Sequence, residues 1–277
     1  MPLETTENGI GADHYKFLQT FVYSQSGIVI GDDKHYLLQT RLAPITRQLG
    51  LGSIGELCGV LATGRETAVR RQVVEAMTTN ETYFFRDPSH YDALKTSLLP
   101  ELREQRKLTR KLSFWSAAAS TGQEIYSLAM QLSELGLGDW NLQLLGTDFS
   151  TQVLERARAA KYLQIEVNRG LPTPMLVKYF QRQGLEWQLK DTIRRLVRFE
   201  QIDLRAPMRA LGPFDAVFCR NVLIYFDAAT RRKILEEMHG TLFRGGWLLL
   251  GTAELPTGLE RLFERKMVGA ATVYVAR

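Results

Sequence analysis

The sequence predicts an α/β protein in which a small all-helical domain precedes a domain built on a mostly parallel sheet. Residues 1–76 contain helical patterns and no strand-like run, whereas short apolar runs alternate with helical stretches from Asp87 onward. Strands that alternate with helices form parallel pairs through right-handed crossovers, and ligands bind such sheets at the carboxyl ends of the strands. A length of 277 residues fits two domains.

The first 76 residues predict a bundle of about four helices that ends near Met77. One apolar stripe recurs at helical spacing, at Leu38, Leu42, Ile45 and Leu49. Asp32 is the expected N-cap of that helix. Ser53 and Thr63 each begin a capping-box pattern, so each is expected to open a further short helix.

The second part begins with Asp87 as the expected N-cap of a helix and Pro88 at its first position. Apolar runs predict a buried strand at 111–119, a second strand at 140–148 and three more apolar strands in the segments RFEQIDL, FDAVFCR and GGWLLLGT. Helices are expected between them, at 122–135 and after Ser150, which is the expected cap of its helix. The last segment, RKMVGAATVYVAR, predicts a hairpin with its turn around Gly269.

Composition excludes several classes of protein. The two cysteines, Cys58 and Cys219, rule out a disulfide framework, and the four histidines show no metal-ligand spacing, so we expect no metal site. The N-terminus has no signal-peptide pattern and no run reaches the roughly 18 apolar residues of a membrane span. We therefore expect a cytoplasmic protein without membrane insertion.

The basic charge of the chain is weak evidence for a partner. The net charge is +5 and the pI is near 9.2, which alone does not predict nucleic-acid binding. Residues 178–198 contain six basic residues and two acidic ones. This run could bind an acidic partner, or it could be a solvated face.

The segment SAAASTGQE (116–124) occupies the turn after the first predicted strand. Small residues allow a ligand to approach the backbone, and the following helix presents free amide groups at its N-terminus. The G-x-G-x-x-G spacing of a pyrophosphate site is absent. Simple tight packing of small residues is the alternative interpretation.

Asp148 ends the second predicted strand. An acidic residue at this place in nucleotide-binding α/β folds accepts hydrogen bonds from ribose hydroxyls. Alternatively, Asp148 caps the helix that begins near Ser150. A ribose-binding acid without a phosphate loop favours an adenosine ligand that has no phosphates, a description that S-adenosylmethionine fits.

The segment TNETYFFRD (79–87) connects the two predicted domains and mixes polar and aromatic residues. It is either a linker whose aromatic side chains pack under the next helix or a segment that closes over a ligand.

Three segments together resemble a known family. FDAVFCRNVLIYF (214–226), TNETYFFRD and WSAAASTGQEIYSLAM resemble the chemotaxis receptor methyltransferases of the CheR family. The resemblance extends from SGIVIGDDKHYLLQTRL near the N-terminus to GGWLLLGTAE near the end.

This resemblance implies a two-domain enzyme. Residues 1–76 would form a helical receptor-recognition domain, 77–90 a linker that closes over the cofactor, and 91–277 a Rossmann-like S-adenosylmethionine-dependent methyltransferase domain. A small antiparallel β-subdomain is expected at about 180–198. The implied activity is methylation of glutamate side chains of chemoreceptors, which gives methyl esters and S-adenosylhomocysteine.

The resemblance also assigns residues. Cofactor contacts are expected at Asn80, Thr82, Arg86, Glu124, Asp148, Asp203, Leu204, Arg220 and Asn221, and catalytic roles at Arg86, Arg220 and Tyr225. Asp203 stands where we expect an asparagine in this family. Receptor contacts are expected at Lys34, Arg41 and Arg47, with Lys34 and Arg41 on one helix face.

Two other function classes stay open from the sequence. A nucleic-acid amino methyltransferase also places an asparagine and an aromatic residue after the fourth strand, but it favours prolines between them, which NVLIY lacks. A non-catalytic module could instead sense S-adenosylmethionine or its demethylated product. The partner is expected to be the helical cytoplasmic region of a chemoreceptor. Because the turn at Gly184 is short, we expect no dependence on a receptor C-terminal pentapeptide.

Overall fold

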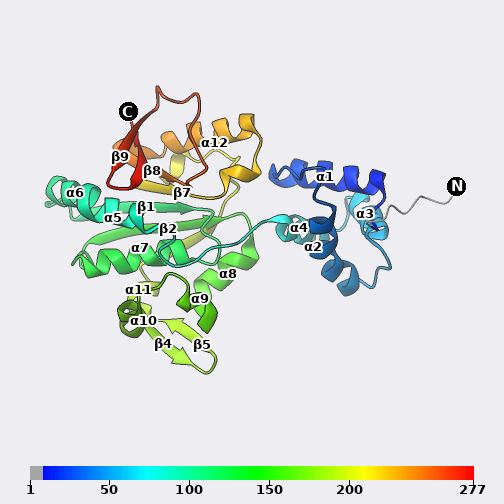
Figure 1. Cartoon of the computed structure of the whole chain (residues 1–277), viewed down its shortest axis with the longest axis horizontal. Coiled ribbons are helices and arrows are strands. Elements are labelled where there is room, and N and C mark those ends of the chain that lie inside the picture. Colours follow the sequence, from blue (N-terminus) through cyan, green and yellow to red (C-terminus); the bar gives the residue numbers. More distant parts are fainter. Residues whose placement is uncertain (1–8) are drawn as a thin grey trace. The chain divides into compact units, whose positions relative to one another are not determined.

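The computed structural model describes residues 9–277, which divide into two compact units (Figure 1). The helical unit consists of the described residues up to Thr79 together with Tyr225–Thr230. The α/β unit consists of Asn80–Ile224 and Arg231–Arg277. The division after Thr79 falls inside the linker that the sequence predicts at 77–90.

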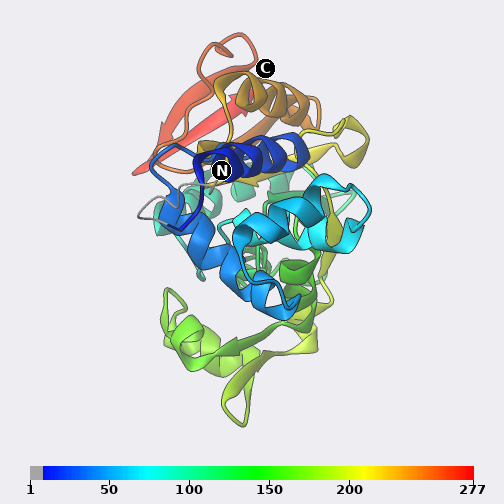
Figure 2. The same ribbon diagram turned by 90° about the vertical axis from the view of Figure 1, so that its right-hand side faces the viewer.

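The helical unit contains four helices in residues 9–79, as the sequence predicts (Figure 2). They are α1 Ala12–Ser26, α2 His35–Gln48, α3 Ile54–Ala62 and α4 Thr67–Met77. Leucines from three of them are fully buried and form the core of the unit: Leu18, Leu38, Leu42, Leu57 and Leu61. Because each helix buries one apolar face, its apolar residues recur about every 3.6 positions, which is the pattern that predicts a helix from the sequence.

Two of the predicted caps in this unit are wrong. The cap position of α2 is Lys34, and the carboxylate of Asp32 instead accepts a hydrogen bond of 2.8 Å from Gln19 Nε2 of α1. Thr63 lies at the C-terminal end of α3, and α4 begins only at Thr67. Ser53 does cap α3, because its hydroxyl accepts the Glu56 backbone N–H at 3.1 Å.

The α/β unit is built on a seven-stranded sheet with strand order β6-β2-β1-β7-β8-β10-β9. The strands are β1 Lys111–Ala117, β2 Asn141–Asp148, β6 Val197–Gln201, β7 Phe214–Cys219, β8 Leu242–Leu250, β9 Phe263–Val268 and β10 Ala271–Ala276. The first five pair in parallel, and β10 runs antiparallel to both of its neighbours. All five predicted strands and the C-terminal hairpin are therefore confirmed, although the edge strand β6 is only partly buried.

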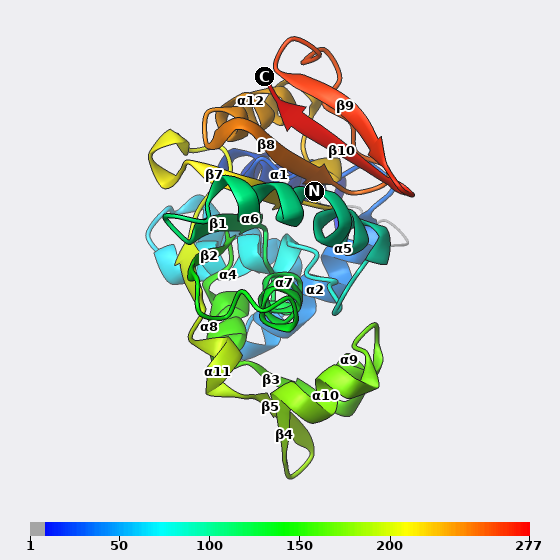
Figure 3. The ribbon, with the colours of Figure 1, turned by 90° about the vertical axis from the view of Figure 1, so that its left-hand side faces the viewer.

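Helices cover both faces of this sheet. They are α5 Pro88–Ala93, which continues through a π-helical segment at Leu94–Leu98 into α6 Leu99–Gln105, then α7 Gln123–Glu134, α8 Thr151–Ala159 and α12 Ala228–His239. Figures 1 and 3 show α7 and α8 on one side of the sheet and α12 on the other. The central strands β1 and β7 are buried along almost their whole length, as is typical of parallel sheets covered on both faces.

The unit also contains a second, small antiparallel sheet with strand order β3-β5-β4 (Figure 3). Its strands are β3 Lys161–Leu163, β4 Phe180–Gln183 and β5 Glu186–Leu189, and its helices are α9 Gln164–Asn168, α10 Thr173–Tyr179 and α11 Asp191–Arg194. The hairpin turns at Gly184, whose φ is +62°. After β5 the chain enters α11, which begins at Asp191. The strand that completes this sheet, β3, lies before the predicted range 180–198.

The aromatic residues of the linker are partly structural. Phe84 is fully buried and makes edge-to-face contacts with Tyr162 of β3 and Phe180 of β4, with ring centroids 5.0 and 5.6 Å apart. Gly170 comes so close that a Cβ atom built on it would lie 2.0 Å from the Phe84 carbonyl oxygen. The linker is therefore fixed to the small sheet through one aromatic side chain.

Candidate cofactor site

The turn between β1 and α7 has an unusual backbone. Ala118 and Ser120 have φ values of +59° and +51°, a region that residues other than glycine occupy rarely, and Gly122 has a φ of +92°. The Ser120 N–H donates to Asp148 Oδ2 at 2.9 Å, and the Ser120 hydroxyl donates to the Asn80 carbonyl at 2.8 Å. This strained turn therefore joins the carboxyl ends of two strands to the start of the linker.

Asp148 lies at the end of β2 and is only 8% exposed. Its carboxylate accepts the backbone N–H of Ser120 and, at 3.0 Å, that of Ser150. The cap of α8 is Ser150, whose hydroxyl accepts the Val153 N–H. Asp148 is thus not the helix cap, and two backbone groups orient its carboxylate at the edge of the sheet where a ribose-binding acid is expected.

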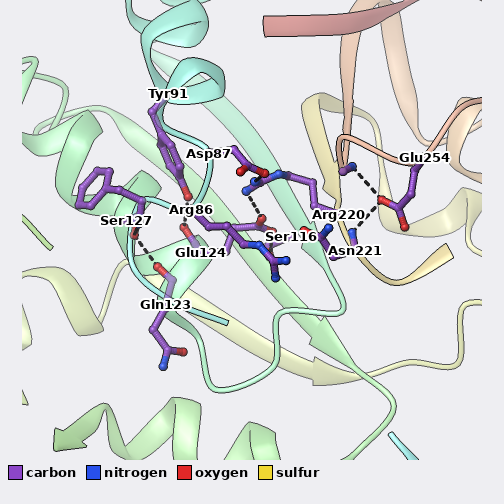
Figure 4. A network of polar contacts seen from close by, with 12 residues as sticks. Arg86, Asp87, Tyr91, Ser116, Gln123, Glu124, Ser127, Arg220, Asn221 and Glu254 are labelled. Atoms are coloured by element: carbon purple, nitrogen blue, oxygen red, sulfur yellow. Dashed lines mark hydrogen bonds and ion pairs between the residues drawn. The ribbon is translucent and has the colours of Figure 1, made fainter. Parts of the chain in front are cut away.

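Arg220 forms the centre of a buried ion cluster (Figure 4). Its side chain is 1% exposed, Nη1 donates to Glu124 Oε2 at 2.8 Å, and Nη2 pairs with Asp87. The other oxygen of Glu124 accepts the Ser116 hydroxyl of β1 at 2.7 Å. Burial opposes the charge of Arg220, but Glu124 and Asp87 outweigh it, so the pKa of Arg220 is raised.

Asp87 occupies the predicted N-cap position of α5, but its side chain does not cap the helix. Asp87 does precede Pro88 at the first position of α5, as predicted, but it has a φ of +53° and its side chain makes no cap hydrogen bond. Its carboxylate is used by Arg220, which follows it by 133 positions in the chain. A distant cation thus takes the side chain that local sequence reasoning assigned to the helix.

Two polar atoms of this cluster favour a bound ligand. Arg220 Nε and Asn221 Oδ1 are buried and have no hydrogen-bond partner among residues 9–277. Because an unsatisfied buried donor or acceptor is costly, such atoms fit a site that a polar ligand completes. Arg220, Glu124 and Asp87 together carry a charge of −1, which favours a ligand with positive groups. S-adenosylmethionine, with its ammonium and sulfonium groups, fits both features.

The predicted linker contacts have mixed outcomes. The Asn80 side chain is exposed, and its backbone carbonyl makes the contact to Ser120. Arg86 is half-buried, donates to the Glu81 carbonyl at 3.2 Å and lies 5.5 Å from the centre of the Tyr83 ring. Thr82 is half-buried. The cofactor roles of these three side chains stay predictions.

Asp203 and Leu204 follow β6 at the same edge of the sheet. Leu204 is buried, whereas the carboxylate of Asp203 pairs with Arg205, whose Nη2 lies 2.6 Å from Oδ2. An ionised carboxylate only accepts hydrogen bonds, while an amide also donates them. An ionised aspartate at this position would therefore only accept hydrogen bonds from an adenine ring, whereas an asparagine would also donate them.

Tyr225 belongs to the helical unit. Its carbonyl accepts the Val29 N–H at 2.9 Å, and Phe226 forms a β-bridge with Ile28. Asp227 accepts the hydroxyl of Tyr23 at 3.0 Å. These contacts fix the backbone of the segment, and the catalytic role of Tyr225 stays a prediction.

The expected receptor residues have different surroundings. Lys34 is exposed and pairs with its neighbour Asp33, and Arg47 is exposed. Arg41 is half-buried, and its guanidinium donates to the carbonyls of Ala76, Met77 and Thr78 and to the hydroxyl of Thr79. Burial lowers the pKa of Arg41, although the nearby Tyr225 opposes this shift. Arg41 thus holds the end of α4 and the residues that follow it.

Sequence reasoning gave no role to Glu254, whose buried carboxylate lies beside Asn221. Its only sequence signal was its place after β8 in the GTAE segment that contributed to the resemblance. Among residues 9–277, no group of acidic, histidine or cysteine side chains could hold a metal ion.

The fold and site define the class of protein. The sheet is covered on both faces, and the oriented acid at the end of β2 and the buried cluster around Arg220 follow the carboxyl ends of its strands, where ligands bind such sheets. Residues 80–270 match the family model described as "CheR methyltransferase, SAM binding domain". Residues 13–78 match the model "CheR methyltransferase, all-alpha domain". The chain is an S-adenosylmethionine-dependent methyltransferase, and it belongs to the CheR family.

Similar curated proteins cover nearly the whole chain. Chemotaxis protein methyltransferase 1 of Pseudomonas aeruginosa is 39% identical over 95% of this chain and 97% of that protein. The protein of the same name from Vibrio cholerae is 38% identical over 96% and 97%, and the chemotaxis protein methyltransferase of Escherichia coli is 34% identical over 94% and 91%. Among solved structures, the glycopeptide N-methyltransferase MtfA aligns with a TM-score of 0.34 and 19% identity, covering 68% of this chain and 72% of that one. Similarity at that level does not establish a shared fold.

Proposed function

We propose that this chain is a protein-glutamate O-methyltransferase that methylates glutamate side chains in the cytoplasmic helical region of chemoreceptors. The observation that carries the proposal is its similarity to chemotaxis protein methyltransferases along both units. The products are glutamate methyl esters and S-adenosylhomocysteine. A cytoplasmic location follows from this substrate, and no helix within residues 9–277 has the length and apolar character needed to cross a membrane.

The reaction makes few demands on acid–base chemistry. When bound, S-adenosylmethionine supplies a methyl group on a positively charged sulfur. A glutamate side chain is already ionised at pH 7 and needs no general base. The residues of the site therefore have to orient the carboxylate and exclude water, and positioning of this kind contributes roughly 7–11 kcal/mol in favourable cases.

Named residues have distinct parts in this proposal. Asp148 accepts hydrogen bonds from the ribose hydroxyls, while Arg220 and Glu124 fix the charge distribution beside the methionine part. Arg86 binds either the methionine carboxylate or the substrate glutamate. Tyr225 orients the acceptor carboxylate. The cationic character of the cofactor matches the charge of −1 on the cluster of Arg220, Glu124 and Asp87.

We assign receptor docking to the helical unit. Lys34 and Arg47 are exposed cations there, so they are available to an acidic receptor surface. Arg41 contributes to docking indirectly, because its guanidinium is engaged with the end of α4.

Independence from a receptor C-terminal pentapeptide completes the proposal. The β4–β5 hairpin has a short turn at Gly184, so it lacks a long loop that would embrace a peptide. Four of the six basic residues in 178–198 pair with acidic side chains of the chain itself: Lys178, Arg194, Arg195 and Arg198. Titration of such a peptide by calorimetry tests the point, and micromolar binding would contradict it.

Methylation of receptor membranes with labelled cofactor tests the proposed function. We expect base-labile label in the receptor and none in RNA. Base-stable label in RNA would favour the amino methyltransferase alternative. Cofactor binding without transfer to either substrate would favour a sensing module.

A further inference from the structure

A single buried carboxylate gathers the backbone N–H groups of the loop that follows β7. Glu254 is 5% exposed and lies four residues after the end of β8. Its oxygen Oε2 accepts the N–H groups of Asn221 and Gly251, each at 2.7 Å. Its oxygen Oε1 accepts those of Val222 at 2.9 Å and Leu223 at 2.7 Å, with Ile224 at 3.4 Å.

These contacts tie the carboxyl ends of two neighbouring strands together. Strand β7 ends at Cys219, and β8, which pairs with it in parallel, ends at Leu250. At these ends no further ladder hydrogen bonds are available, so the N–H groups of the loops need other acceptors. Glu254 supplies that acceptor both for the loop that follows β7 and for Gly251, which follows β8.

The loop conformation requires such a clamp. Asn221 has a φ of +59°, a left-handed conformation that is unfavourable for a residue with a side chain unless its surroundings hold it. Gly251 lies so close that a Cβ atom on it would be 2.7 Å from Glu254 Oε2 and 2.8 Å from Asn221 Nδ2. The carboxylate, the glycine and the strained asparagine thus form one tightly fitted unit.

We infer that Glu254 is a positioning residue of the methyltransferase site: it acts through the backbone of Asn221 and its neighbours, and it touches no reacting atom. The left-handed conformation of Asn221 bends the chain directly after Arg220, whose side chain enters the buried cluster with Glu124. It also places Asn221 Oδ1 in a buried position without a partner among the described residues. The inference rests on the proposed assignment of Arg220 and Asn221 to the cofactor.

The test compares Glu254→Gln with a matched control, Asp215→Asn. Glutamine keeps the size of the side chain, but its NH2 group must face at least one of the backbone N–H donors. Asp215 is 2% exposed and also accepts a backbone N–H, from Ser113 at 2.8 Å, but it lies at the opposite end of β7. Each variant thus neutralises one buried carboxylate that accepts backbone N–H groups. The two carboxylates lie at opposite ends of β7, and only Glu254 is beside Asn221.

Calorimetry with S-adenosylhomocysteine gives the first readout. We expect Glu254→Gln to weaken binding at least tenfold, which corresponds to about 1.4 kcal/mol, and Asp215→Asn to stay within twofold of the parent. Equal affinity of Glu254→Gln and the parent would overturn the inference. If the parent itself binds no cofactor, the proposed function fails, and the second readout still judges the clamp.

Hydrogen exchange of the peptide that contains residues 220–225 is that second readout. We expect the amides of Asn221, Val222 and Leu223 to exchange at least tenfold faster in Glu254→Gln and at the parent rate in Asp215→Asn. Unchanged exchange in a folded Glu254→Gln protein would refute the clamp. If Glu254→Gln does not fold, Gly251→Ala replaces it, because the added methyl group displaces the Glu254 carboxylate. Parent-like cofactor affinity and hydrogen exchange in Gly251→Ala would contradict the inference.

Discussion

Replacement of Arg41 by alanine is expected to lower the free energy of unfolding of the protein. The Arg41 guanidinium makes two short hydrogen bonds, 2.8 Å to the Met77 carbonyl and 2.9 Å to the Thr78 carbonyl. A hydrogen bond to a charged group contributes about 1.5–3 kcal/mol. Because Arg41 is only half-buried, water replaces part of this, and we expect a total loss of about 2–3 kcal/mol for the two bonds.

Chemical denaturation followed by circular dichroism measures this loss. The midpoint should fall while the dependence of stability on denaturant stays the same. The matched control is Arg47→Ala on the same helix, because Arg47 is exposed and its side chain has no hydrogen bond or ion pair within residues 9–277. It should stay within about 0.5 kcal/mol of the parent. An Arg41→Ala protein as stable as the Arg47→Ala control would refute the reasoning.

This result also decides how receptor docking should be tested. A receptor contact at Arg41 predicts that Arg41→Glu lowers receptor methylation and leaves cofactor affinity intact. Arg41 contacts the first residues of the linker, so such a loss would also follow from a loosened end of α4. Lys34→Glu and Arg47→Glu are the cleaner variants. They should lower methylation at low salt with unchanged stability, and parent-like rates for both would contradict charge-guided docking.

Three further outcomes are expected. Asp148→Ala should weaken S-adenosylmethionine binding by about 1–3 kcal/mol, because hydrogen bonds from the ribose hydroxyls to a charged acceptor are lost. Unchanged affinity by calorimetry would exclude the ribose role. Arg220→Met should destabilise the protein by about 3–5 kcal/mol in denaturant unfolding, since it leaves two carboxylates without their partner; a loss below about 1 kcal/mol would contradict the buried cluster. Burial lowers the pKa of His90 to about 4, while an unfolded histidine binds a proton near pH 6.5. Stability should therefore fall between pH 6.5 and 4 by up to about 3 kcal/mol more in the parent than in His90→Asn, and equal pH profiles of the two proteins would show that His90 titrates normally.

Most of the fold was predictable because it depends on local patterns. The strands from Lys111 to Ala117 and from Phe214 to Cys219 are buried on both faces, and their mainly apolar runs are visible in the sequence. The caps were less predictable. Thr63 and Glu66 have the spacing of a capping box, but the preceding helix α3 extends to Thr63. The Asp87 carboxylate pairs with Arg220, which is distant in the chain.

The candidate site shows the same division. Asp148 and Arg220 could be proposed because each follows a predicted strand, and the carboxyl ends of parallel strands meet at one edge. Arg41 and Glu254 could not be interpreted in this way, because both act on backbone groups. A backbone N–H or carbonyl carries no residue identity, so contacts of this kind leave no signature in the sequence of their partners.

The segment Tyr225–Thr230 has a consequence for how this protein is divided and recombined. Although it begins 146 positions after Thr79, it belongs to the same compact unit as residues 9–79 and supplies partners to Val29 and Tyr23. A fragment that stops at residue 79 therefore lacks a piece of its own unit, and an exchange of that fragment between relatives has to carry six distant residues with it.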